Sequence, residues 1–266
     1  MTSTTYSVSD SEWLVIQEIL PPEIYTGKGS QGGRPHSDLR KIFSGLMYWI
    51  RTGCQWELIP REYGSKTTLA KFKEKWVMAE SCSQLFKTSL ELYDDKIGID
   101  WEFQSIDGSI KRAPGCSENA GKNPTDRARP GTKHMILTDK KGIPLAVTTI
   151  PANKPDMNQL ENTFSNFYIE RPDPLEVTQH LCTDKGFDSA ENRDTVLEWG
   201  YQSHIRPKDE GWIPIRKYSP KRWVVERTHA WLNLFRGIHT RRIKCSKTYD
   251  AMTLLACALV ILSKLR

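Results

Sequence analysis

From about residue 100 onward, short β-type runs alternate with helical patterns in the order β-β-β-α-β-α-β-α. The expected strands cover residues 101–109, 133–138, 145–150, 179–183 and 201–206. The expected helices cover residues 158–168, 189–199 and a long segment that starts near Lys221. Lys140-Lys141-Gly142 is expected to join the second and third strands as a hairpin turn. This order requires a mixed sheet with helices packed against it.

Acidic residues stand at three distinct places in that order. Asp107 lies near the end of the first strand, Asp184 directly follows the fourth strand, and Glu226 lies on the last helix. This strand order, with acids at these places, is that of the RNase H-like fold, in which strand ends present carboxylates to metal ions. We therefore predict an α/β fold with an RNase H-like mixed five-stranded sheet flanked by helices.

The first part of the chain carries helical patterns instead. Ser9-Asp10-Ser11-Glu12 has the form of a capping box. Ser37 is expected to cap a second helix that ends at Thr52-Gly53, and a fourth helix is expected to end before Asp94-Asp95. Between them, a third helix places three large apolar side chains inward: Leu69, Phe72 and Trp76. These patterns predict a small all-α domain of the helix-turn-helix-like kind.

The third helix is also a candidate DNA reader, because Lys71, Lys73 and Lys75 lie on it. The alternative is that these lysines merely keep a surface helix solvated, and the two interpretations are evenly balanced. The loop before this helix is longer than the turn of a standard helix-turn-helix.

The formal net charge of +6 is unevenly distributed. Between Ile205 and Lys247 the acidic side chains are only Asp209, Glu210 and Glu226, among many lysines and arginines. Such a stretch can neutralise DNA phosphates and release their counterions. A solvated face is the more common meaning of a charge run, but the contiguity with Glu226 favours DNA.

The six cysteines are scattered, without a Cys-x-x-Cys pair. This predicts reduced thiols in a cytosolic protein and not a zinc site or a disulfide framework. The N-terminus shows no signal-peptide pattern. The most apolar stretch, residues 251–262, is expected to form a buried helix too short to span a bilayer. No membrane partner is expected.

Three carboxylates on such a fold suit hard divalent cations. Mg²⁺ prefers oxygen ligands and keeps several waters, and three carboxylates can hold two ions about 4 Å apart around one scissile phosphate. One ion would activate water or a DNA 3′-hydroxyl, and the other would stabilise the leaving oxygen. We predict that Asp107, Asp184 and Glu226 are both catalytic residues and metal ligands. The predicted cofactor is Mg²⁺, with Mn²⁺ able to substitute.

The last predicted helix carries one polar stripe at helical spacing, formed by Arg222, Glu226, His229, Asn233 and Arg236. The alternative is an ordinary Arg–Glu pair on a surface helix, which the two aspartates make less favoured. The remaining expected DNA contacts lie near the three acids: Arg227, Lys185, Lys111 and Arg112. Asp188 and Asp156 are expected to cap the helices that follow them. His134 and His204 are expected in the core or at its rim, and Trp212 is expected to pack, with base stacking as the alternative.

Nearly the whole chain resembles, in order, the short bacterial insertion-sequence transposases of the DDE superfamily. The motifs that carry the resemblance are Gly33-Arg34-Pro35-His36-Ser37-Asp38-Leu39-Arg40, Arg51-Thr52-Gly53-Cys54-Gln55-Trp56-Glu57-Leu58-Ile59-Pro60, Ile106-Asp107-Gly108-Ser109, Ala152-Asn153-Lys154-Pro155-Asp156, Thr183-Asp184-Lys185-Gly186-Phe187-Asp188 and Arg222-Trp223-Val224-Val225-Glu226-Arg227.

The resemblance implies a helical DNA-binding domain at residues 1–96 and an RNase H-like DDE catalytic domain at 97–266. It implies transposition at terminal inverted repeats, by metal-dependent strand cleavage and strand transfer, with no covalent protein–DNA intermediate. The implied partners are double-stranded DNA, as inverted repeats and target, and a second copy of the chain in a synaptic complex. The implied location is the bacterial cytoplasm, at the nucleoid.

One departure from the family's wider signature concerns the last helix. Arg222 precedes Glu226 by four residues, as in the family's Arg-x-x-x-Glu. Many relatives add an upstream tyrosine and a lysine seven positions after the glutamate, where this sequence has Ser219 and Asn233. The change removes one family DNA contact and makes Arg236 a candidate substitute.

Two other functions are compatible with the fold. One is a structure-specific nuclease such as an RNase H or a junction resolvase, which the Arg-Pro-His and Arg-Thr-Gly-Cys-x-Trp motifs disfavour. The other is a domesticated DNA-binding protein that does not cut DNA, which the intact acidic triad disfavours.

Overall fold

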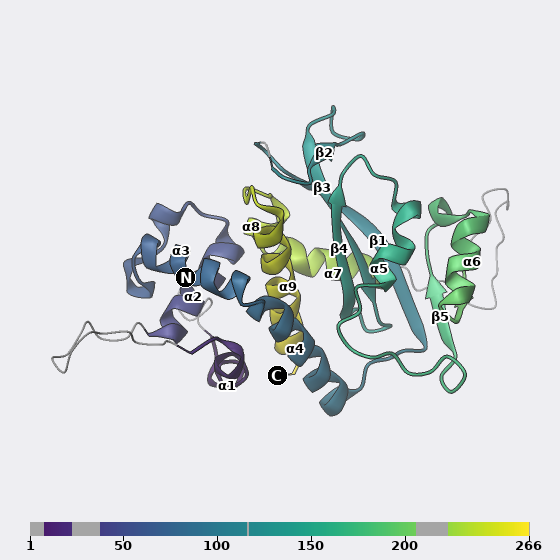
Figure 1. The fold of residues 1–266 in the computed structure, drawn as a ribbon, viewed down its shortest axis with the longest axis horizontal. Coiled ribbons are helices and arrows are strands. Elements are labelled where there is room, and N and C mark those ends of the chain that lie inside the picture. The colour runs from purple at the N-terminus through teal and green to yellow at the C-terminus, as the bar shows by residue number, and fades with distance from the viewer. Residues whose placement is uncertain (1–7, 23–37, 116, 206–222, 266) are drawn as a thin grey trace.

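The computed structural model describes residues 8–22, 38–115, 117–205 and 223–265. Helices of the N-terminal part lie on one side of the molecule, a sheet lies on the other side, and the C-terminal helix runs between them (Figure 1). Several expectations fall outside the described residues: the cap at Ser37, the Gly33–Ser37 part of the first motif, and the roles of Trp212 and Arg222.

Within the described residues, the N-terminal part has four helices: α1 (Asp10–Ile19), α2 (Leu39–Thr52), α3 (Lys66–Met78) and α4 (Ser81–Ile97). Two single-turn 3₁₀ helices, η2 (Trp56–Leu58) and η3 (Arg61–Tyr63), lie between α2 and α3. The predicted capping box at Ser9 and Glu12 is confirmed. Leu69, Phe72 and Trp76 are buried as expected.

Two helix boundaries differ from the expected ones. Asp38 caps α2, and its Oδ1 accepts a hydrogen bond from the backbone N–H of Lys41 at 3.1 Å. Helix α4 does not end before Asp94 but continues to Ile97. It stops there because Gly98 takes a positive φ of 81°, which leaves the helical backbone and which residues with a Cβ rarely adopt.

The sheet contains the five expected strands, here β1 (Phe103–Arg112), β3 (Pro130–Thr138), β4 (Pro144–Pro151), β5 (Gln179–Cys182) and β6 (Tyr201–Ser203). A two-residue strand that was not expected, β2 (Gly121–Lys122), pairs with the start of β3. The order of the five is β4-β3-β1-β5-β6; β3 is antiparallel to β1 and β4, and β5 is parallel to β1 and β6. This is the RNase H-like arrangement.

Helices cover both faces of the sheet. Met135 and Leu137 of β3 belong to a core cluster with residues of α5 (Leu160–Phe164) and α6 (Ala190–Glu198). Ile136, between them, belongs to the cluster on the other face, with α7 (Trp223–Asn233) and α9 (Ser246–Ser263). Successive strand residues point to opposite faces, so α5 and α6 cover one face, and α7 and α9 cover the other.

Two of the expected helices are shorter than predicted. The segment expected as a helix over 158–168 consists of a 3₁₀ helix, η4 (Asp156–Gln159), followed by α5. Helix α5 stops early because the backbone of Phe167 pairs with Ala146 of β4. The long helix expected from Lys221 is α7, which ends at Asn233, and Arg236 begins a separate short helix, α8 (Arg236–His239). Arg236 therefore does not continue the polar stripe of α7.

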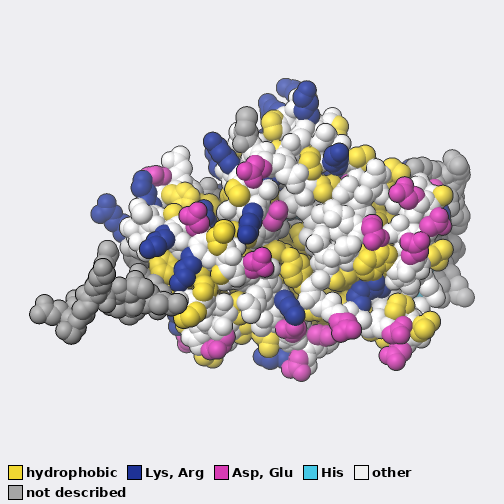
Figure 2. Space-filling model, in the orientation of Figure 1, with side chains coloured by type: hydrophobic (Ala, Val, Ile, Leu, Met, Phe, Trp, Pro, Cys, Tyr) yellow, Lys and Arg dark blue, Asp and Glu magenta, His cyan; other side chains and the backbone are white. Residues whose placement is uncertain are grey.

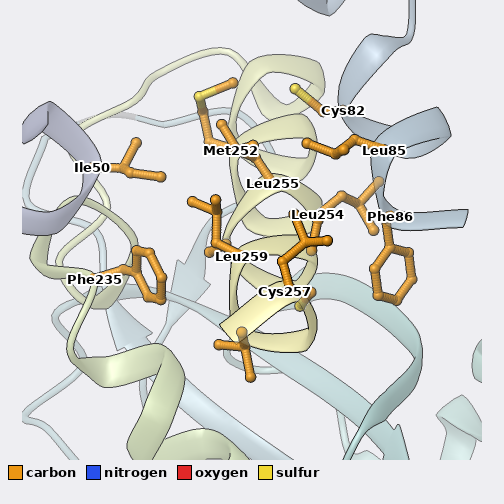
Figure 3. Packing of buried hydrophobic residues seen from close by; sticks show 14 of the residues in the cluster. Ile50, Cys82, Leu85, Phe86, Phe235, Met252, Leu254, Leu255, Cys257 and Leu259 are labelled. Atoms are coloured by element: carbon orange, nitrogen blue, oxygen red, sulfur yellow. The ribbon is translucent and has the colours of Figure 1, made fainter. Parts of the chain in front are cut away.

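Helix α9 is the centre of the larger core. Figure 3 shows Met252, Leu255 and Leu259 of this helix among side chains from α2, α4 and the loop after α7. The helix has 18 residues and is long and apolar enough to cross a membrane by length and composition, so the expectation that it is too short was wrong. Since 67% of that stretch is buried inside the protein, it serves as a core helix here.

The N-terminal helices are fixed to the C-terminal part at one close backbone contact. Gly53, the left-handed residue that ends α2, lies so near α8 that a Cβ there would be 3.1 Å from the carbonyl carbon of Arg236. A Cβ on Gly237 would in turn be 3.0 Å from the carbonyl oxygen of Ile50. Two glycines thus allow two backbones to approach each other where side chains would keep them apart.

We expect Leu259→Ala to lower the free energy of unfolding by about 2–5 kcal/mol, because it leaves a cavity at the centre of the larger core. Leu197→Ala is the matched control, since Leu197 is 64% exposed on α6. The control should change the free energy by no more than about 0.5 kcal/mol. Chemical denaturation of the two variants measures the difference, and equal losses would contradict the central position of α9.

Candidate active site

The first predicted acid, Asp107, lies in the middle of β1 and faces α7. Its strand position pairs with Ile136 of β3. Opposite residues of an antiparallel pair share a face, and Ile136 packs in the cluster with α7 and α9. The Asp107 side chain is half-buried, and its Oδ1 accepts a hydrogen bond from the backbone N–H of Gly108 at 2.9 Å.

Position 108, next to this acid, must be glycine because the segment Ala152–Asp156 leaves no room there for a side chain. A Cβ at position 108 would lie 2.5 Å from Oδ2 of Asp156. Asp156 also forms an ion pair with Lys133, a buried lysine of β3. The expectation that Asp156 caps a helix was wrong, because the 3₁₀ helix η4 that it begins has no side-chain cap. Asp156 of the motif Ala152–Asp156 instead packs against Gly108 of β1, next to Asp107, and forms an ion pair with Lys133 of β3.

The second acid, Asp184, follows the end of β5 and is exposed. Strand β5 is parallel to β1, and Cys182 pairs with Ser105. Asp184 has an extended backbone, so continuing this register by two residues places it opposite Asp107, on the face of α7. Neighbouring strands are about 4.8 Å apart. The Asp184 carboxylate also accepts a hydrogen bond at 2.7 Å from the backbone N–H of Lys185, which starts the 3₁₀ helix η5 (Lys185–Phe187).

The third acid, Glu226, is exposed in the first turn of α7. Two hydrogen bonds attach this helix to β1. Lys111 Nζ donates to Asn233 Oδ1 at 2.6 Å, and His229 Nε2 lies 3.3 Å from the backbone oxygen of Asp107. The three acids therefore belong to adjacent elements on one side of the sheet.

The donor chemistry suits a hard cation, but the arrangement is not that of an assembled metal site. Among the described residues, no group of three histidine, cysteine, aspartate or glutamate side chains lies close enough together to hold a metal ion. The structure therefore places the acids on one side of the sheet without gathering all three carboxylates into one metal-holding group.

Lys111 and His229, both expected to contact DNA, are buried. Lys111 Nζ also donates to Ser109 Oγ at 2.9 Å, so this ammonium group is hydrogen-bonded within the protein. Burial lowers the pKa of Lys111 to about 8. Burial, and then the nearby Lys111 charge, lower the pKa of His229 to about 3, which makes its ring neutral at physiological pH. Their burial does not fit a DNA contact; they join α7 to β1.

The other expected DNA contacts differ in exposure and in their partners. Arg227 stacks between the rings of Trp223 and Trp231, and its Nη2 donates to the Lys141 carbonyl at 2.5 Å. Arg112 is exposed and pairs with Asp126 at 3.0 Å. Of the remaining expected DNA contacts, Lys185, Arg236 and Lys71 are exposed. Lys75 and Lys73 are half-buried on α3.

Two smaller expectations also have clear outcomes. Asp188 does not cap the helix after it, because Ser189 is the cap of α6 and Asp188 instead accepts hydrogen bonds from Arg193. His134 is fully buried, as expected, and Nε2 of His204 lies 2.9 Å from Nδ1 of His180 at the sheet edge.

Sequence reasoning placed His134 in the core or at its rim but did not anticipate the buried polar residues that lie beside it near α7. His134 and Arg241 are fully buried next to Lys111, and the surrounding charges add to burial in lowering the pKa of His134. Arg241 lies over the ring of Tyr249, 4.5 Å from its centroid. The sequence did hint at buried polar residues here, because Lys133-His134 interrupts an otherwise apolar strand pattern. A strand pattern does not reveal, however, which helix packs against the strand.

Comparisons with known proteins agree on one family. Residues 8–86 match the family model described as "Putative transposase of IS4/5 family", and residues 100–211 match the model "Transposase DDE domain". The "Putative transposase for insertion sequence element IS402" of Burkholderia cepacia is 38% identical over 150 residues, which cover 55% of this chain and 70% of the relative. The chain belongs to the IS4/5 family of DDE transposases.

Other similarities are weaker. An uncharacterized 16.2 kDa protein of the IS402 element of Burkholderia cepacia is 27% identical over 44% of the transposase chain and 80% of its own length. The catalytic domain of the Mos1 mariner transposase aligns with 70% of this chain and 92% of its own, at 12% identity and a TM-score of 0.30. A Mos1 paired-end complex gives the same TM-score. Scores this low add nothing to the assignment. The matched DDE region contains Asp107 and Asp184 and ends before Glu226.

The buried Lys111 gives the transposase a specific pH dependence. Below pH 8 this lysine is charged in both the folded and the unfolded chain, so the cost of burying its charge is fully present. Above pH 8 the folded state loses the proton first, so the unfolded chain binds more protons and stability increases with pH.

We therefore expect wild type to gain stability relative to Lys111→Met by at most about 1.4 kcal/mol per pH unit as the pH rises from about 8 to about 10. Urea denaturation at a series of pH values measures this difference. The matched control is Lys87→Met, since Lys87 is exposed on α4. A stability difference between wild type and Lys111→Met that stays constant with pH would contradict the burial of a charged lysine between β1 and α7.

Proposed function

We propose that this DDE transposase binds the terminal inverted repeats of its insertion sequence and cleaves and transfers DNA strands with Asp107, Asp184 and Glu226. The observation that carries the proposal is that three acids from separate parts of the chain lie on adjacent elements of the same side of the sheet. Helix α7 is held against β1 by partly buried hydrogen bonds one and two turns after Glu226. These hydrogen bonds fix the position of Glu226 relative to β1, which a glutamate that only faces solvent would not require.

DDE transposases use divalent metal ions, and we propose Mg²⁺ for this one, with Mn²⁺ as a substitute. The described residues do not form a ready metal site, so we propose that the three carboxylates come together only when metal and DNA bind. Mutual repulsion of three negative charges favours their separation until a cation is present.

The proposed division of labour follows the chain. Residues 1–96 would bind the inverted repeat, with Lys71 and its neighbours on α3 as candidate contacts, and residues 97–266 would perform the chemistry. Arg222, Arg227, Asn233, Arg236, Lys185 and Arg112 are proposed to lie along the DNA near the acids. Figure 2 supports this division, because lysine and arginine gather over the N-terminal helices and acids are more frequent at the far end of the sheet. We propose the bacterial cytoplasm, at the nucleoid, as the place of action.

We expect Asp107→Asn, Asp184→Asn and Glu226→Gln each to reduce cleavage of an inverted-repeat fragment by more than about 100-fold, because each removes a charged metal ligand. Binding of the fragment should persist, since removing negative charge does not weaken attraction to phosphate. Gel assays with Mg²⁺, Mn²⁺ or a chelator measure both quantities.

The matched control for the aspartate variants is Asp194→Asn, an exposed acid on α6 away from α7. It should cut at the wild-type rate. Retained cleavage in Glu226→Gln would remove Glu226 from the site, and cleavage by wild type in the chelator would remove the metal.

We also propose that two copies of the transposase join two DNA ends. Light scattering of the protein mixed with inverted-repeat duplex should give a complex that contains two chains and two duplexes. A complex of one chain and one duplex that still performs strand transfer would contradict this proposal.

A further inference from the structure

A groove lies where the N-terminal helices meet the connection between α8 and α9. It has a volume of about 560 Å³, within the usual range for ligand pockets. One wall comes from the motif Arg51–Pro60, which has no role in the proposed active site, and the other comes from residues 240–245. Lys73 of α3 also lines the groove.

Two tryptophans form an aromatic platform in this groove. The rings of Trp49 and Trp56 are stacked, with centroids 4.3 Å apart and an interplanar angle of 29°. Trp49 is buried, whereas Trp56 is half-buried. Trp56 also lines a second hollow of about 520 Å³, together with Arg61 and Lys66. The indole of Trp56 is thus supported by Trp49 and borders open space in two places.

The charged side chains that line the groove are all basic. Lys73 Nζ lies 5.3 Å from the ring centroid of Trp56 and 5.9 Å from that of Trp49. Burial lowers the pKa of Lys73, with nearby Glu74 acting in the opposite direction. Arg242 and Lys244 are exposed on the facing wall, and no carboxylate is among the described residues that line the groove. An anion bound in the groove would compensate the Lys73 ammonium group for the hydration that it loses on burial.

The two walls are held in a fixed relation. The contact of Gly53 with Gly237 joins α2 to α8 at the base of the groove, and both glycines line it. Because backbone meets backbone there, α2 and α8 are held close together at these two glycines. The groove is therefore bounded on this side by a backbone contact and not by side chains alone.

We propose that this groove binds an unpaired segment of a DNA strand, with a base stacked on Trp56 and the flanking phosphates at Lys73, Arg242 and Lys244. Stacked aromatic rings beside basic groups are the usual means of holding single strands. The bases of an intact duplex are stacked on one another and cannot reach a recessed indole. The proposal rests on the transposase acting on DNA, and it is independent of which residues hold the metal.

Photocrosslinking of the full-length wild-type chain tests the position of the base. The probe is an oligothymidylate with one 5-iododeoxyuridine, alone or annealed to its complement. We expect irradiation to attach the single strand to a peptide that contains Trp56, identified by mass spectrometry, and the duplex to attach there far less. Absence of Trp56 from the crosslinked peptides, or equal crosslinking of the duplex, would overturn the proposal.

Binding of the same single strand by variants provides a second test. Trp56→Ala should weaken it by about 5- to 150-fold, the range expected for loss of one stacked base. Trp56→Phe should stay within about threefold of wild type, because it keeps an aromatic ring. Lys73→Gln should lower the slope of log affinity against log salt by about 0.7, the value for one phosphate contact on a single strand. Lys87→Gln, on the exposed surface of α4, is the matched control.

The outcomes separate this groove from the proposed active site. Unchanged affinity in Trp56→Ala would overturn the groove as a single-strand site, whether or not the protein cuts. If wild type fails to cut in any metal but crosslinks at Trp56, the active-site proposal fails and the groove stands. The crosslinking test uses wild type, so a variant that does not fold leaves a clear answer.

Discussion

The packing of α9 is the interaction on which the other parts of the structure depend. Almost all of its side chains from Tyr249 to Leu262 are buried. They belong to one cluster with side chains of α2, α4, β4 and α7. Figure 3 shows Ile50 of α2 and Leu85 of α4 on opposite sides of this helix. Removal of this much apolar surface from water is the largest favourable term in folding. The N-terminal helices and the sheet are therefore held by the same helix, which belongs to the last part of the chain.

The position of Glu226 depends on a second, polar contact. Helix α7 could slide along the sheet if it were held by apolar contacts alone, because hydrophobic burial is not directional. The Lys111–Asn233 hydrogen bond at 2.6 Å fixes its register against β1. It does so at the cost of burying a lysine, which is why the pKa of Lys111 is lowered. The buried charge of Lys111 lowers the stability of the fold, whereas its hydrogen bond to Asn233 positions α7.

Sequence patterns predicted the elements of the sheet better than their ends. The strands and the hairpin turn follow from alternation and turn residues, which are local properties. Helix α5 is shorter than its pattern because Phe167 pairs with Ala146, and α7 ends before Arg236. Lys111 and His229 looked like exposed DNA contacts because helical or strand spacing says which residues share a face, but not what packs against that face.

The sequence by itself determined that the chain has helices followed by an RNase H-like sheet, with acids at Asp107, Asp184 and Glu226. These features depend on residue order and on local propensities. Only the tertiary structure decided that the acids lie on one side of the sheet and that Lys111 and His229 hold α7 instead of facing solvent. It also decided that Trp56, Lys73 and Arg242 line one groove, although they are far apart in the chain. These relations depend on packing between distant segments, which no local pattern specifies.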